Sequence, residues 1–392
     1  MSGRAPGPRY DGGMARDVVS LTEQLVEVDT SPGFPTAPLI DRIVEIARAG
    51  RAEVTLQAGR HDGVELHNLV LRYGGDGPAG LVLAGHLDTV PWRADTAATT
   101  TPVRDGRQLF GRGTADMKGA LAASLLAALS RAEGLKRPLV VAMTFAEEVG
   151  CHGAAHLMDD VAIMGDLSEA VCLVGEPTEL VPVVGHKGYA TGELVLKGEP
   201  AHSSNPWAGA DASVALGTLL RDLHLLRDRL REEGDPSGQH VPPCSTLNTG
   251  LVTAGRAKNI VPDEARVSIE LRPLPTADEA GLRERVDACL QLACAAAPGV
   301  SGTAHWVPGR PAFNQDPDHP AVRWLAERAD GRIEVVPFYT EAELYRRGMG
   351  VPTIVCGPGS IAAAHRSDEA VSFDQLEAGQ ALYEQAIDAF CR

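Results

Sequence analysis

The chain has 392 residues, 44% of them hydrophobic, and carries 36 basic against 52 acidic side chains, a formal net charge of −16. This length exceeds what one compact core usually serves, so we expect two domains. The negative charge disfavours nucleic acid and anionic membrane surfaces as partners, and no apolar run approaches the length of a membrane span.

The cysteine content and the sequence of residues 1–14 both indicate a cytoplasmic protein. The seven cysteines are odd in number and form no Cys-x-x-Cys pair, which indicates reduced thiols. Residues 1–14 are rich in Gly, Pro and Arg and lack the apolar segment of a signal peptide. We expect them to form a disordered tail.

The first half of the chain alternates predicted helices and strands. Amphipathic or Ala/Leu-rich patterns predict helices at residues 17–27, 39–50 and 118–132. Short, continuously apolar runs predict buried strands at residues 81–84, 139–145 and 170–174. This alternation predicts an α/β domain with a mostly parallel sheet and helices on both faces.

After residue 187 the pattern changes. Alternating residues predict strands at 189–196, 246–252, 265–271 and 303–306, and longer periodic stretches predict helices at 211–231 and 277–297. The order β-α-β-β-α-β is that of a ferredoxin-like α+β module. We therefore expect a first domain made of residues 1–186 and 309–392, into which a second domain of residues 187–308 is inserted.

Residues able to bind metal follow the predicted strands or stand at helix starts and loops. They are His86, Asp116, Glu147, Glu148, Glu176 and His365. Two histidines and three carboxylates can hold two divalent metals if one carboxylate bridges, which leaves one carboxylate to move protons. Each residue alone has an ordinary interpretation, such as a helix cap or a solvent-facing side chain. Five such segments in one chain favour the metal site.

Spacing adds two details to this site. Asp88 lies two residues after His86, so its side chain points the same way and can accept a hydrogen bond from the second ring nitrogen. Glu147 and Glu148 are adjacent, and their charges would repel in one site unless a metal takes one of them.

These segments also carry a family resemblance. The motifs GHLDTVP (85–91), GTADMKG (113–119), AEEVG (146–150), GEPT (175–178) and AHRSDE (364–369) occur in this order. From about residue 18 onwards the chain resembles the two-metal aminoacylases and exopeptidases, which include acetylornithine deacetylase, succinyl-diaminopimelate desuccinylase and carboxypeptidase G. The stretches GHKG (185–188), RPLP (272–275) and GPGS (357–360) look closest to acetylornithine deacetylase.

The resemblance implies a role for each residue of the site. One metal would be held by His86, Asp116 and Glu176. The second would be held by Asp116, Glu148 and His365, with Asp116 as the bridge. Glu147 would be the general base, and Asp88 would assist catalysis by orienting His86. The metals would be two divalent ions per chain, with zinc expected and cobalt or manganese also suited to such nitrogen and oxygen donors.

For the inserted domain the resemblance implies a lid that also dimerises. His202 would stabilise the oxyanion, lent to the neighbouring subunit of a homodimer. Substrate contacts would come from Asn259, Arg272, Glu341 and Gly359. Three of these residues have ordinary alternatives: His202 as a turn residue, Arg272 in a salt bridge at a strand end, and Glu341 as a structural carboxylate.

The expected function is removal of the acyl group from an N-acyl amino acid, a small-molecule substrate. N-acetylornithine is the leading substrate, ahead of N-acetylcitrulline and succinyl-diaminopimelate. Dipeptidase or carboxypeptidase action is a separate alternative. An inactive homologue that only binds its ligand would have lost some of the metal-binding residues. Here all five ligand positions and Glu147 are present. One departure from the family concerns residues 92–110, which lack the usual Asp-Pro-Phe segment.

Overall fold

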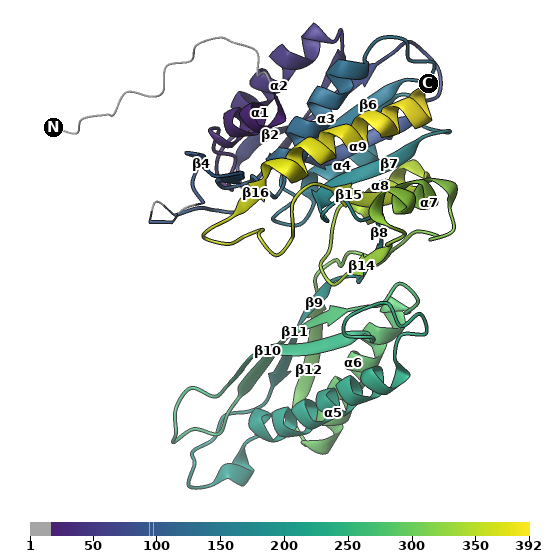
Figure 1. Ribbon diagram of the computed structural model, residues 1–392. Coiled ribbons are helices and arrows are strands. Elements are labelled where there is room, and N and C mark those ends of the chain that lie inside the picture. Colours follow the sequence, from purple (N-terminus) through teal and green to yellow (C-terminus); the bar gives the residue numbers. More distant parts are fainter. Residues whose placement is uncertain (1–16, 94, 97) are drawn as a thin grey trace, which may run out of the picture. The chain divides into compact units, whose positions relative to one another are not determined.

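The computed structural model describes residues 17–93, 95–96 and 98–392, which divide into two compact units (Figure 1). Unit 1 comprises the described residues up to Pro182 together with Leu344–Arg392, and unit 2 spans Val183–Glu343. Residues 309–343, which we expected in the first domain, thus group with the insertion. The tail expected at residues 1–14 lies outside the described residues.

Six strands of a mixed sheet form the centre of unit 1. In spatial order its strands are β1 (Glu53–His61), β2 (Val64–Tyr73), β6 (Leu139–Thr144), β3 (Leu81–His86), β7 (Val171–Pro177) and β15 (Thr353–Gly357). From β6 to β15 the neighbours run parallel, but β2 pairs antiparallel with both β1 and β6. Most neighbours are thus parallel, as predicted, and the β1–β2 hairpin, which was not predicted, makes the sheet mixed. Asp62 and Gly63, both at positive φ, make its two-residue turn.

Helices cover the central strands of unit 1. Every residue of β3, β6, β7 and β15 is buried, as expected for strands covered on both faces. The helices are α1 (Val18–Val26), α2 (Ala37–Ala49), α3 (Lys118–Arg131), α4 (His152–Asp159), α9 (Phe373–Cys391) and the short η1 (Val161–Met164), with α8 (Ala342–Met349) running on from unit 2. The small side chains of α3 let it pack against α1, α9 and the sheet together. Asp17 and Ser372 cap α1 and α9 by accepting backbone N–H bonds.

A small antiparallel sheet brings two distant segments of unit 1 together. Its strands are β4 (Val103–Asp105), β5 (Gln108–Phe110) and β16 (Ala370–Ser372), with β5 in the middle. Ala370 lies opposite Phe110, so residues just before β16 lie beside those just after β5. This pairing matters for the site described below.

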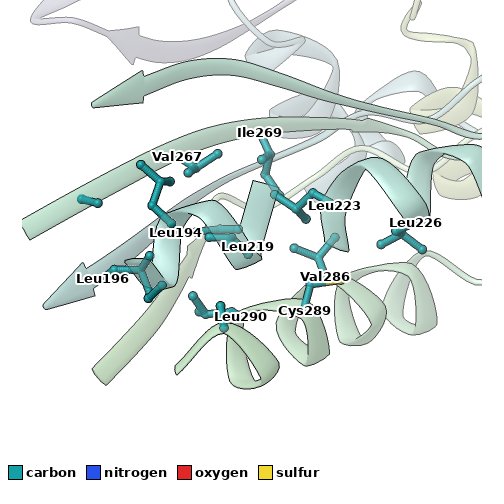
Figure 2. Close-up of a cluster of buried hydrophobic side chains, with 14 of the residues drawn as sticks. Leu194, Leu196, Leu219, Leu223, Leu226, Val267, Ile269, Val286, Cys289 and Leu290 are labelled. Atoms are coloured by element: carbon teal, nitrogen blue, oxygen red, sulfur yellow. The ribbon is translucent and has the colours of Figure 1, made fainter. Parts of the chain in front are cut away.

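Unit 2 contains the predicted β-α-β-β-α-β module. Its elements are β9 (Ala190–Lys197), α5 (Ala212–Glu233), β10 (Thr246–Ala254), β11 (Glu264–Arg272), α6 (Glu279–Ala296) and β12 (Ser301–Trp306). The antiparallel sheet has the order β10-β11-β9-β12. Alternate residues of β11 are buried, and Val267 and Ile269 face Leu219 and Leu223 of α5 (Figure 2). The two helices therefore cover one face of this sheet.

The remainder of unit 2 is a second group of short elements. These are β8 (Val183–His186), β13 (Phe313–Asn314), β14 (Glu334–Val336), α7 (Pro320–Ala326), η2 (Pro206–Ala208) and η3 (Glu327–Ala329). β13 pairs antiparallel and β14 parallel with β8. None of the seven cysteines, all within the described residues, forms a disulfide bond. Among the described residues, no helix combines the length and apolar character that crossing a bilayer requires.

Candidate active site

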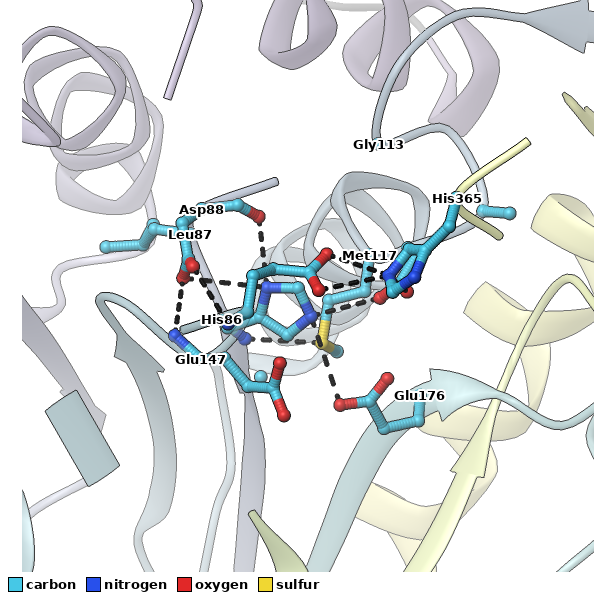
Figure 3. Close-up of polar contacts among 12 residues, drawn as sticks. His86, Leu87, Asp88, Gly113, Met117, Glu147, Glu176 and His365 are labelled. Carbon is cyan, nitrogen blue, oxygen red and sulfur yellow. Dashed lines mark hydrogen bonds and ion pairs between the residues drawn. The ribbon is translucent and has the colours of Figure 1, made fainter. Parts of the chain in front are cut away.

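The polar residues of the candidate site gather at one edge of the unit 1 sheet (Figure 3). His86 ends β3, Glu176 lies near the end of β7, and Glu147 and Glu148 follow β6. These three strands are adjacent and parallel, so their carboxyl ends meet at the same edge, where open α/β sheets place ligands.

Asp116 stands between the two histidines. Its Oδ1 lies 3.0 Å from Nε2 of His86, and its Oδ2 lies 3.3 Å from Nε2 of His365. The carboxylate is almost fully buried, just before helix α3, and the peptide bond that follows it is cis. One side chain thus faces both histidines with different oxygens, the arrangement that a bridging ligand requires.

Two groups of side chains could each hold a metal ion. They are His86, Asp116 and Glu176, and Asp116, Glu148 and His365. Within each group the ligand atoms lie within 4.8 Å of one another. Imidazole nitrogen and carboxylate oxygen are donors that zinc, cobalt and manganese accept. The residues present therefore fit a pair of divalent ions that share Asp116.

The ring of His86 is oriented by the main chain. Its Nδ1 lies 3.0 Å from the carbonyl oxygen of Asp88 but 3.7 Å from the Asp88 carboxylate. Nδ1–H therefore donates to the carbonyl, which leaves the Nε2 lone pair directed toward Asp116. We expected the Asp88 side chain to make this contact, and the structure assigns it to the backbone.

The Asp88 carboxylate instead holds the turn that carries the two glutamates. Its two oxygens accept the backbone N–H groups of Glu147 and Glu148, at 3.0 and 3.1 Å. Charge-assisted bonds of this kind are stronger than those between neutral groups. The thiol of Cys151 also donates to Oε1 of Glu147 at 3.3 Å. Glu147 is thus held through its backbone and its side chain, while Glu148 faces His365 at 3.0 Å.

The electrostatics of the site favour positive charge. Hydrogen bonds to Asp116 and Glu148 raise the pKa of His365 to about 10. Burial lowers the pKa of His86, but Asp116, Glu176 and Asp88 outweigh it and bring that pKa well above its ordinary value. Burial would raise the pKa of Asp116, yet its bonds to His365 and His86 bring it below its ordinary value. Bound metal ions would displace the protons that this cluster attracts.

The side chain of Met117 packs closely against the glycine that precedes His86. A Cβ on Gly85 would lie 2.3 Å from Cε of Met117, so no larger residue fits without a shift. The Sδ atom of Met117 also accepts the backbone N–H of His86 at 3.2 Å. The motif around His86 and the motif around Asp116 therefore touch directly.

Comparison with known proteins gives this arrangement a family. The model described as Peptidase family M20/M25/M40 matches residues 82–389. An acetylornithine deacetylase of Myxococcus xanthus is 38% identical over 377 residues, which cover 95% of this chain and 97% of the relative. The chain belongs to peptidase family M20/M25/M40. An acetylornithine deacetylase of Vibrio parahaemolyticus, 33% identical over 332 residues, covers 83% of this chain and 85% of its own.

Solved structures share the family M20 fold. A tripeptidase from Staphylococcus aureus superposes with a TM-score of 0.74 at 21% identity, over 96% of this chain and 99% of its own. The Bacillus subtilis YXEP protein, described as a dinuclear metal-binding peptidase from the M20 family, has a TM-score of 0.70 at 16% identity. It covers 95% of this chain and 97% of its own. At such identities the likeness concerns the fold.

Four of the five residues expected to bind substrate or oxyanion lie in unit 2 of this M20 chain: His202, Asn259, Arg272 and Glu341. His202 is exposed, and its Nδ1 accepts the backbone N–H of Ser204 at 3.1 Å. The backbone carbonyl of Asn259 accepts a hydrogen bond from the backbone N–H of Ser203, the residue after His202. Arg272 donates to Glu270 at 2.7 Å and stacks over the ring of Tyr189, so it has the salt bridge that we considered as its alternative role.

The other two expected substrate contacts are tightly enclosed. Glu341 is fully buried in unit 2, as is its neighbour Thr340, a setting typical of a structural carboxylate. Gly359, in unit 1, has a φ of +89° and donates its N–H to the Gln375 side chain at 3.2 Å. A Cβ on Gly359 would contact Ala115, so its backbone lies against the segment that carries Asp116.

Sequence reasoning missed part of the support of the site. Of the two acidic residues that follow His365, Asp368 pairs with Arg366 at the surface. Glu369 is buried and contacts Arg112 and the segment before Asp116. No local motif signals this contact, because its partners are 257 residues apart in sequence.

Proposed function

We propose that this family M20 chain is a two-metal amidohydrolase that converts N-acetylornithine to ornithine and acetate, a step of arginine biosynthesis. The observation that carries the proposal is a pair of metal-holding groups that share Asp116, with Glu147 on the adjoining turn. The names of the relatives at 38% and 33% identity support the substrate.

Each side chain of the site has a task in this reaction. The two groups that share Asp116 would hold two ions, zinc or alternatively cobalt or manganese, which when bound would supply an acidic water at neutral pH and a Lewis acid for the acyl carbonyl. Glu147 accepts the proton of the attacking water and delivers it to the leaving nitrogen. Asp88 keeps Glu147 in place through its backbone N–H, and Cys151 does so through the carboxylate.

His202 stabilises the developing oxyanion. Its Nδ1 accepts the N–H of Ser204, so in the neutral ring the proton resides on Nε2. Nε2–H is then a donor suited to an oxygen that gains negative charge in the transition state. The backbone contact between Ser203 and Asn259 holds the loop that carries His202.

Recognition of the substrate falls to groups around these residues. The Arg272 guanidinium grips the α-carboxylate after exchanging its bond to Glu270. Asn259 and the backbone at Gly359 contact the acyl amino acid. Glu341 complements the cationic ornithine side chain, and the net charge of −16 favours the approach of a cation.

The β-α-β-β-α-β module acts as lid and dimerisation domain of a cytoplasmic homodimer. Strand β10 is at the edge of its sheet, and Leu251 and Val252 are exposed along it. An exposed apolar edge of this kind invites pairing with a second copy across a two-fold axis. Such a dimer lets His202 serve the site of the partner subunit.

A rate comparison tests the proposed substrate. Purified protein with excess zinc is assayed on acetylornithine, acetylcitrulline, succinyl-diaminopimelate and several dipeptides. We expect the highest kcat/KM on acetylornithine. Faster turnover of succinyl-diaminopimelate or of a dipeptide would reassign the substrate while the two-metal chemistry stands. If protein that holds two ions hydrolyses none of these amides, the proposed hydrolase activity is overturned.

A further inference from the structure

Glu369 is a buried carboxylate that contacts the backbone leading to Asp116. The side chain has no exposed surface. Its Oε1 accepts three backbone N–H groups, from Gly113 at 3.0 Å and from Ala115 and Asp116 at 3.1 Å each. A single oxygen therefore fixes the direction of three N–H groups within four residues of this loop, including that of the residue that faces both histidines.

Arg112 completes the contact and extends it to a second loop. Its Nη1 forms an ion pair with Oε2 of Glu369, and both side chains are buried. Its Nη2 donates to the carbonyl of Arg366 at 3.1 Å, one residue after His365. The pair thus joins the loop of Asp116 to the loop of His365.

Both loops need such support. The N–H groups of residues 113, 115 and 116 would each cost free energy if buried without an acceptor. His365 has a φ of +61°, in the left-handed region that non-glycine residues rarely adopt. A conformation of this kind persists only when its surroundings enforce it. Arg112, paired with Glu369, restrains the His365 loop by donating to the carbonyl of Arg366.

We propose that Glu369 and Arg112 are positioning residues that set the geometry of Asp116 and His365 and thereby the affinity of the site for its metal ions. This inference rests on the proposed two-metal function. A buried ion pair contributes little net stability on average, because desolvation offsets most of the attraction between its charges. Partners of metal ligands of this kind typically contribute 10- to 100-fold to metal affinity.

Two substitutions at one position separate the acceptor oxygen from the charge. Glu369→Gln removes the charge but keeps an oxygen that can accept the three N–H groups. Glu369→Met has a similar length and replaces the oxygens with one weakly accepting sulfur. Asp368→Asn, in the exposed ion pair with Arg366 next to it, is the matched control. Metal-free protein of each variant is titrated with zinc in a calorimeter, and its melting temperature shows that it is folded.

We expect Glu369→Met to lose 10- to 100-fold in affinity for at least one zinc ion. The loss of zinc affinity in Glu369→Gln should be at least tenfold smaller than in Glu369→Met. Asp368→Asn should bind zinc like the parent. Should Glu369→Met not fold, Arg112→Met combined with Glu369→Met removes both buried charges, and Arg112→Met combined with Glu369→Gln is its partner for the same comparison.

The outcomes distinguish this inference from the function on which it rests. Parent-like zinc affinity in folded Glu369→Met, or equal losses in the Gln and Met variants, would overturn the positioning role alone. A parent protein that binds no zinc would instead overturn the two-metal centre itself.

Discussion

His186 should make the stability of unit 2 fall as the solution becomes acidic. The ring is fully buried at the end of β8, between the rings of Phe313 and Tyr339 at centroid distances of 5.3 and 4.7 Å. Its Nδ1 lies 3.0 Å from the carbonyl oxygen of Lys187. Burial is the main cause that lowers the pKa of His186 from 6.5 to about 4.

The lowered pKa of His186 determines how much stability is lost as the pH falls. Between pH 6.5 and pH 4 the unfolded chain binds a proton at His186 and the folded chain does not. The stability that the neutral ring contributes is therefore complete above about pH 6.5 and is lost as the pH falls toward 4. With 1.36 kcal/mol per pKa unit, the loss is about 2 kcal/mol between pH 7.5 and pH 5 and about 3 kcal/mol in full.

The substitution His186→Phe removes this titration while keeping an aromatic ring beside Phe313 and Tyr339. We expect the variant to be less stable at pH 7.5, since the bond to Lys187 is lost, but to lose about 2 kcal/mol less on going to pH 5. Urea unfolding of metal-free protein, followed by tryptophan fluorescence at several pH values, gives both slopes. His305→Phe, at an exposed position of β12, is the control and should retain the parent slope. Equal pH slopes for the parent and His186→Phe would refute the reasoning.

Four further outcomes concern the reaction. Protein loaded with excess zinc should approach two ions per chain by metal analysis, and a firm value of zero would contradict the metal centre. Glu147→Gln should keep its metal and lose about 10²–10⁴-fold in kcat, whereas near-normal turnover would assign the proton transfer to another group. Glu341→Gln should impair acetylornithine more than neutral acetylmethionine, and equal losses would exclude charge recognition. Mixed dimers of His202→Ala and Glu147→Ala should recover roughly a quarter of parent activity after subunit exchange, because half the dimers then have one intact site. No recovery after verified exchange would place His202 in its own chain.

Continuous apolar runs made the central strands predictable. Residues 81–84 and 139–145 have no polar side chain to place on a solvent face except Thr144, which explains why both were recognised as buried. The rule that parallel strands present ligands at their carboxyl ends then placed His86 and Glu147 together. The β1–β2 hairpin was missed because its first strand is half exposed and mixes charged with apolar residues. The Asp62-Gly63 pair was the available signal, since Asp-Gly favours this type of turn.

Contacts made through the backbone, or between residues far apart in the chain, could not be predicted from the sequence. The spacing of His86 and Asp88 indicated that the side chains share a direction, but it could not reveal that the carbonyl binds the ring while the carboxylate binds the Glu147 turn. Arg112 and Glu369 meet only because β5 pairs with β16. That pairing joins very short strands, which leave no periodic pattern to read.

The division of unit 1 into two stretches of chain has a consequence for biosynthesis. His365 follows Glu148 by 217 residues, with all of unit 2 between them. At about 5–20 residues per second, a ribosome needs roughly 10–40 s to reach His365 after Glu148. Throughout that interval the nascent chain offers Asp116 and Glu148 without their histidine, and without the Glu369 contacts that orient the loop. In the proposed two-metal site, the ligand set of the second ion is complete only once His365 has been made, long after the ligands of the first ion.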